Sequence, residues 1–173
     1  MRLIVGLRVD RKTLHTAADR IDQVLSTKLC DDEHQLWLSF SIHLLMDLGE
    51  VEEPSMPELT RIIREANQTI PVNPILYSRI ENRYRENLSL APEAESVEVW
   101  TEFAVHTRRQ LRQVNPAGWD DRPWDPRLQM WGACNVVSKA SVLLPYPLLW
   151  SPERLVICRY NGEYAEILKD QSI

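Results

Sequence analysis

The feature that most constrains the fold is a segment near the end of the chain with two strand-like runs, residues 155–160 and 163–168, on either side of Asn161-Gly162. Asn-Gly supplies the two positive φ angles that a type I′ hairpin turn requires. An isolated hairpin is barely stable in water, so it needs a third strand or a helix to pack on. Residues 2–9 alternate in polarity with the period of a strand. We therefore expect residues 2–9 to pair with the hairpin.

Apolar residues recur at helical spacing through most of the remaining chain. The segment 34–48 is apolar nearly all round, which is typical of a buried central helix. We expect helices over about 11–27, 34–48, 57–68, 74–88, 96–114 and 126–144, with Pro92 as an alternative start of the fifth. The predicted fold is therefore α+β: a bundle of five to six helices with a small antiparallel sheet formed by the N-terminal strand and the C-terminal β-hairpin. We expect one domain over residues 1–173, a length that suits a single core.

Composition narrows the class of protein and its compartment. The 173 residues are 44% hydrophobic and 26% charged, as in an ordinary globular protein, and the net charge is −5. This charge disfavours broad nucleic-acid binding, which needs a basic face to displace counterions. Three widely spaced cysteines argue against a disulfide scaffold or a zinc knuckle, and no apolar run is long enough to span a bilayer. We expect a soluble cytoplasmic protein without a membrane partner.

Signals for nucleotide or nucleic-acid binding are weak. The chain has only five glycines and no GxGxxG or GxxxxGK[ST] motif, so we expect no cofactor held by a glycine loop, and no other cofactor is indicated. Arginines close to aromatic residues could grip single-stranded nucleic acid, but interspersed glutamates favour ordinary exposed helix faces. The candidate arginines are Arg79, Arg83, Arg85, Arg108, Arg109 and Arg112.

The main alternative function is a metal-dependent enzyme of the helical-bundle type. His43 and Asp47 are four residues apart on the predicted central helix, and Glu102 and His106 are four apart on the long helix. Two such pairs facing each other in a bundle could hold a metal ion for catalysis. The competing interpretation is a core histidine and glutamates that face water, because the apolar stripe of the long helix lies on another side.

The stretch 115–131 is the strongest candidate for a binding surface. Tryptophan and arginine are the residues most often found as binding hot spots, and connectors run over protein surfaces. The same tryptophans could instead plug the end of the bundle. The predicted function is a small protein-interaction module, such as an adaptor, inhibitor or immunity-type regulator, that binds a protein partner without catalysis. Its candidate contact residues are Trp119, Asp120, Asp121, Arg122, Trp124 and Arg127.

Overall fold

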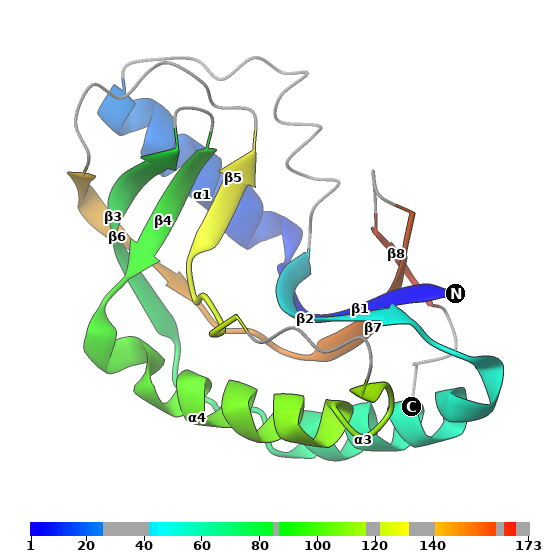
Figure 1. Cartoon of the computed structure of the whole chain (residues 1–173). Coiled ribbons are helices and arrows are strands. Elements are labelled where there is room, and N and C mark those ends of the chain that lie inside the picture. Colours follow the sequence, from blue (N-terminus) through cyan, green and yellow to red (C-terminus); the bar gives the residue numbers. More distant parts are fainter. Residues whose placement is uncertain (26–41, 85–86, 117–121, 132–140, 162–164, 169–173) are drawn as a thin grey trace.

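The computed structural model describes residues 1–25, 42–84, 87–116, 122–131, 141–161 and 165–168, and it contains two four-stranded antiparallel sheets (Figure 1). Sheet A has the order β2-β1-β7-β8 and sheet B the order β5-β4-β3-β6. The strands of sheet A are β2 (Ile42–Glu50), β1 (Arg2–Arg8), β7 (Leu155–Tyr160) and β8 (Ala165–Ile167). Those of sheet B are β5 (Leu128–Trp131), β4 (Asn87–Pro92), β3 (Ile75–Tyr84) and β6 (Ser141–Trp150).

In the described part of the chain, three α-helices cover the sheets (Figure 1). Helix α1 (Arg11–Leu25) packs on β6, behind sheet B in this view. Helices α3 (Met56–Gln68) and α4 (Ala94–Leu111) lie side by side along the lower edge, where α3 contacts β7 and α4 contacts β2 and β3. A short 3-10 turn, η1 (Glu53–Ser55), precedes α3. Both sheets and all three helices contribute to one buried cluster, which includes Leu3, Ile21, Ile62, Ile75 and Trp100.

The predicted pairing of the N-terminal strand with a C-terminal hairpin is confirmed, but the two-residue turn is not. Tyr160 pairs with Ala165, so four residues rather than two separate the strands, and Gly162 lies outside the described residues. Strands β7 and β8 pair antiparallel, and β1 pairs with β7 from Leu3 opposite Arg159 to Leu7 opposite Leu155. Helix α1 begins after Asp10, whose carboxylate accepts a hydrogen bond from the backbone N–H of Thr13 at 2.8 Å. Burial alone would raise the pKa of Asp10, but hydrogen bonds from the backbone N–H and the hydroxyl of Thr13 to its carboxylate lower the pKa below its usual value. The helices expected over 57–68 and 96–114 are also present, as α3 and α4.

The predicted helical bundle is wrong, because three of the segments expected to be helical form strands instead. The first is the central helix over 34–48: its described part belongs to β2, which runs antiparallel to β1. Leu45, Met46 and Leu48 of this strand all belong to the main buried cluster, whereas Leu44 is exposed. A register shift against β1 makes Leu45 an extra residue, so the strand loses the strict alternation that would have distinguished it from a helix.

The second error is the helix expected over 74–88, where β3 and β4 form an antiparallel pair. Leu76, Ile80 and Tyr84 are four residues apart. Four is close to the helical repeat, which favoured a helix. In β3 a register shift between Tyr77 and Arg79 breaks the alternation instead, and the buried residues are Ile75, Tyr77 and Ile80. The density of β-branched and aromatic residues in this segment favoured the strand.

The third error is the helix expected over 126–144. Residues 128–131 form β5, residues from Ser141 onward form β6, and 132–140 lie outside the described residues. The carboxylate of Asp125 accepts a hydrogen bond from the backbone N–H of Arg127 at 3.1 Å, two residues on. This local turn leads the chain into β5 rather than into a helix.

In the described part of the chain, no helix combines the length and the apolar content needed to cross a membrane.

Candidate functional site

The two sheets meet at a cluster of buried rings, which we call the aromatic junction: His43 of β2, Tyr77 of β3, Trp150 of β6 and Trp124 from the segment before β5. The ring of His43 stands edge-on to those of Trp124 and Trp150, with both centroid distances at 5.6 Å. The rings of Tyr77 and Trp150 are 6.5 Å apart. All four side chains are at least nine-tenths buried, so the junction is part of the core that joins the sheets.

Gly6 of β1 lets β2 approach at the position of His43. A register shift between Val5 and Gly6 places Gly6 opposite Leu44. A Cβ atom built on Gly6 would overlap the side chain of Ile42 and would lie 2.6 Å from the carbonyl oxygen of His43. Only glycine fits such a close backbone approach without displacing the neighbouring strand.

The junction favours the neutral form of His43. Burial lowers the pKa of its imidazole to about 4, although the carboxylate and the backbone of Asp125 act in the opposite direction. Nε2 of His43 and Nε1 of Trp124 have no hydrogen-bond partner among the described residues. A neutral imidazole can act as a general base only with an acidic proton in reach, and the contacts recorded for this ring are to aromatic groups and Asp125.

Ion pairs and a hydrogen bond attach the segment around Trp124 to β3. Arg127 pairs with Asp125 at 3.1 Å and with Glu81 of β3 at 3.2 Å. The hydroxyl of Tyr77 donates to the carbonyl oxygen of Pro126 at 2.9 Å. Burial raises the pKa of this hydroxyl well above its ordinary value, and the nearby carboxylate of Asp125 adds to the effect, so Tyr77 stays a donor.

These contacts show where part of the predicted binding surface, the stretch 115–131, lies in the fold. Trp124 is buried against His43, which matches the alternative in which a tryptophan fills the core. Arg127 is held in ion pairs within the chain, whereas Arg122 is exposed. Trp119, Asp120 and Asp121 lie outside the described residues.

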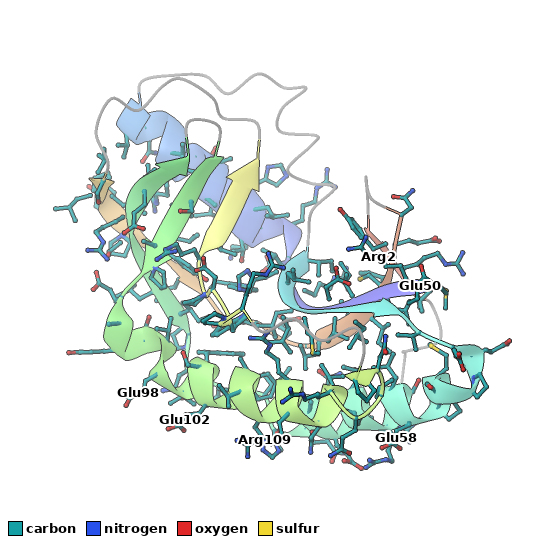
Figure 2. All side chains as sticks on the ribbon, viewed as in Figure 1. Arg2, Glu50, Glu58, Glu98, Glu102 and Arg109 are labelled. Carbon is teal, nitrogen blue, oxygen red and sulfur yellow. The ribbon has the colours of Figure 1, made fainter. Side chains whose placement is uncertain are left out.

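The structure does not bring the proposed metal ligands together. His43 faces the junction, whereas Asp47, on the same strand, pairs with Arg2 at 2.6 Å. Glu102 and His106 are exposed on α4, and Figure 2 shows Glu98 and Glu102 directed away from the sheets. Within the described ranges, no three or more His, Cys, Asp or Glu side chains form a group that could hold a metal ion.

The arginines considered for nucleic-acid binding lie on different elements. Arg79 is exposed on β3, Arg109 is exposed on α4, and Arg108 is buried there. Arg112 follows α4 as its C-terminal cap residue and is exposed. The side chains of Arg83 and Arg85 lie outside the described part of the structure.

One exposed apolar surface was not predicted from the sequence. It consists of the side chains of Leu143, Tyr146 and Leu149, and we call it the β6 edge. They are 72%, 64% and 60% exposed, and β6 is a terminal strand of sheet B among the described residues. Large apolar side chains scattered singly over a surface are ordinary, but several on one edge strand indicate an interaction surface. Pro145 and Pro147 signalled this in the sequence, because proline within a strand is confined to edges and bulges.

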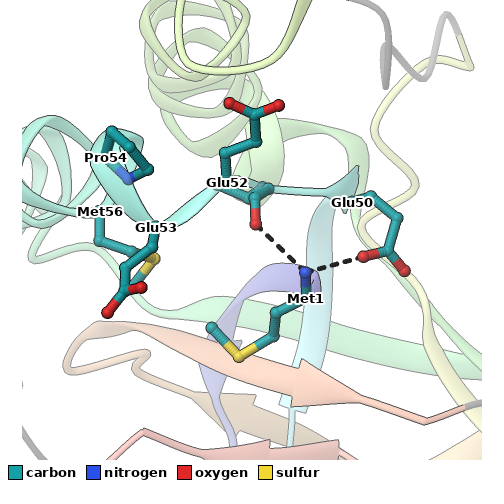
Figure 3. A pocket seen from close by; sticks show the side chains of 7 residues that line it. Met1, Glu50, Glu52, Glu53, Pro54 and Met56 are labelled. Atoms are coloured by element: carbon teal, nitrogen blue, oxygen red, sulfur yellow. Dashed lines mark hydrogen bonds and ion pairs between the residues drawn. The ribbon is translucent and has the colours of Figure 1, made fainter.

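A surface hollow beside the end of β2 has a structural explanation (Figure 3). The amino group of Met1 pairs with the carboxylate of Glu50 at 2.8 Å and donates to the carbonyl oxygen of Val51 at 3.2 Å. The backbone N–H of Val51 returns a hydrogen bond to Met1 at 2.9 Å. The hollow therefore lies over contacts that extend the β1–β2 pairing, and we assign it no ligand.

Comparison with known proteins supports the fold and gives no function. No protein-family model matches the chain, and no curated protein matches it. Among solved structures, the chain is similar to TT0787 of Thermus thermophilus, with 19% sequence identity and a TM-score of 0.58. The match covers 97% of this chain and 94% of that one. At this identity the likeness extends to the fold alone.

Proposed function

We propose that this chain is a protein-interaction module that acts by binding a protein partner through the β6 edge. One observation carries the proposal: Leu143, Tyr146 and Leu149 are all more than half exposed on a single terminal strand. Burying this apolar surface against a partner would release water and stabilise the complex. Aromatic and large aliphatic side chains at the centre of an interface supply much of the binding energy.

The proposed contact surface is the β6 edge, and not the tryptophan-rich stretch 115–131 expected from the sequence. Trp124 is already buried within the chain, and Arg127 already has two carboxylate partners. Using either for a partner would require breaking these contacts, at a cost in free energy. The β6 edge needs no such rearrangement, because its three side chains are exposed as the chain stands.

A capture experiment with matched variants tests the proposal. The full chain, immobilised, is exposed to an extract of its native host, and the bound proteins are quantified by mass spectrometry. The double variant Leu143→Ser/Leu149→Ser should lose a specific partner by at least about tenfold. Val105→Ser is the control, because Val105 is 52% exposed on α4, a helix that packs on α3, β2 and β3.

The same proteins are compared in urea unfolding. Both variants should keep the free energy of unfolding of the parent chain to within about 0.5 kcal/mol, since exposed side chains contribute little to folding. Equal capture by the parent chain and the double variant would contradict the proposal.

A further inference from the structure

We infer that the partner segment docked on the β6 edge combines apolar side chains with Asp or Glu carboxylates. This inference rests on the proposed function and adds the chemistry of the partner. It follows from three features of the surface: the arginines that flank it, the lack of acidic residues on the strand, and the prolines within it.

Arg79 lies beside Leu143 on the neighbouring strand. The two are paired across β3 and β6, so their side chains project from the same face of sheet B. Arg79 is exposed, and its guanidinium is 3.9 Å from Glu81, a longer separation than the 3.2 Å between Glu81 and Arg127. Arg79 can therefore turn toward a partner carboxylate while Glu81 keeps its pair with Arg127.

Arg20 of α1 flanks the middle of the same strand. Its guanidinium lies 5.2 Å from the centre of the Tyr146 ring, a cation–π geometry. The only hydrogen bond recorded for its side chain in the described part of the chain goes to the neutral side chain of Gln23, at 3.4 Å. Arg20 is half-buried, and its Nε has no hydrogen-bond partner among the described residues, so stacking on Tyr146 leaves part of its hydrogen-bonding capacity for a partner carboxylate.

The rest of the strand is uncharged. Residues 141–152 contain no charged side chain, whereas the whole chain has a net charge of −5. An apolar edge flanked by arginines on an otherwise acidic molecule attracts acidic apolar segments and repels basic ones.

The prolines indicate how the segment docks. Pro145 and Pro147 have no N–H to donate, and residues between Leu143 and Leu148 bulge out of the pairing with β3. This interrupts the hydrogen-bonding row that an added strand would need. Docking therefore uses the side chains of the β6 edge, with carboxylates placed over Arg20 and Arg79.

A displayed library of random peptides tests this chemistry on the full chain. Peptides are selected on the parent protein after removal of those that bind the Leu143→Ser/Leu149→Ser variant. Selected peptides should combine apolar residues with Asp or Glu. Arg79→Gln and Arg20→Gln should each weaken their binding by about 2- to 5-fold, the range for exposed ion pairs. Arg109→Gln is the matched control and should leave the affinity unchanged, because Arg109 lies on the outward side of α4 (Figure 2).

Other outcomes separate the inference from the proposed function. Selected peptides without acidic residues, or unaffected by both arginine substitutions, would overturn the inference and leave the proposed function standing. Failure to select any peptide that depends on Leu143 and Leu149 would count against both. Binding to phosphatidylserine vesicles, or dimerisation measured by light scattering, would overturn the inference if the double variant abolished it, because the occupant would then be a membrane or a second copy.

Discussion

Trp150 and Leu149 are neighbours on β6, yet one belongs to the aromatic junction and the other to the β6 edge. Trp150 is almost fully buried between His43 and Tyr77, whereas Leu149 is mostly exposed. Successive side chains of a strand point to opposite faces, so one strand can serve two purposes. Substitution of Trp150 should therefore alter stability, and substitution of its neighbour Leu149 should alter binding.

The two regions also differ in their chemistry. The junction buries polar atoms, and this burial favours the neutral form of its histidine. The β6 edge holds apolar groups in water, beside the exposed Arg79 and the half-buried Arg20. Substitutions in the junction should therefore change the free energy of unfolding, and those at the edge should change binding.

The largest effect is expected from removing the central ring of the junction. Trp150→Ala should lower the free energy of unfolding by about 3–5 kcal/mol, because it deletes a fully buried indole and leaves a cavity. Urea unfolding followed by far-ultraviolet circular dichroism measures this. A loss below about 1 kcal/mol would show that the junction does not hold the sheets together.

Gly6→Ala should have the next largest effect. The added methyl group meets the backbone of His43 and the side chain of Ile42, so β1 and β2 must separate locally. We expect a loss of about 1–3 kcal/mol, the usual cost of overpacking a core, measured by the same urea unfolding. Gly49, at a φ of 65°, provides a contrast, since its substitution by alanine would act through backbone strain instead.

Acidification should weaken the junction through His43. Its pKa is about 4 in the folded chain and about 6.5 when unfolded, so the unfolded state binds the proton first as pH falls. Stability from this group is present above pH 6.5 and is lost as pH falls toward 4, by about 2 kcal/mol between pH 7 and 5. The test is urea unfolding at both pH values for the parent chain and for His43→Phe, which keeps an aromatic ring without a titrating group. An equal loss in both proteins would exclude His43 as the cause.

The smallest change in the free energy of unfolding is expected at Leu149, the neighbour of Trp150 in the sequence. Leu149→Ala should change the free energy of unfolding by no more than about 0.5 kcal/mol, because the side chain is already in water. The measurement is the same urea titration used for Trp150→Ala. A loss comparable to that of Trp150→Ala would remove the distinction between the two regions.

The sequence predicted correctly those helices and strands whose turn residues and apolar spacing fit only one type of secondary structure. Asn161-Gly162 and the alternation over residues 2–9 predicted that β1, β7 and β8 would pair, and the apolar stripes of α3 and α4 predicted their buried sides. The segments of β2 and β3 were mistaken for helices because a bulge in each pairing breaks the alternation of a strand, and the apolar pattern that remains resembles that of a helix. The contacts of His43 with Trp124 and Trp150 join positions 81 and 107 residues apart, so no local pattern predicts them.

The most direct test of the separation between the two regions compares partner capture by two variants. His43→Phe alters the junction, and Leu143→Ser/Leu149→Ser alters the β6 edge, each in the full chain at neutral pH. We expect the partner captured by the parent protein to be retained by His43→Phe and lost by the double variant. Loss of the partner with His43→Phe and its retention by the double variant would place the binding site at the junction and contradict our conclusion.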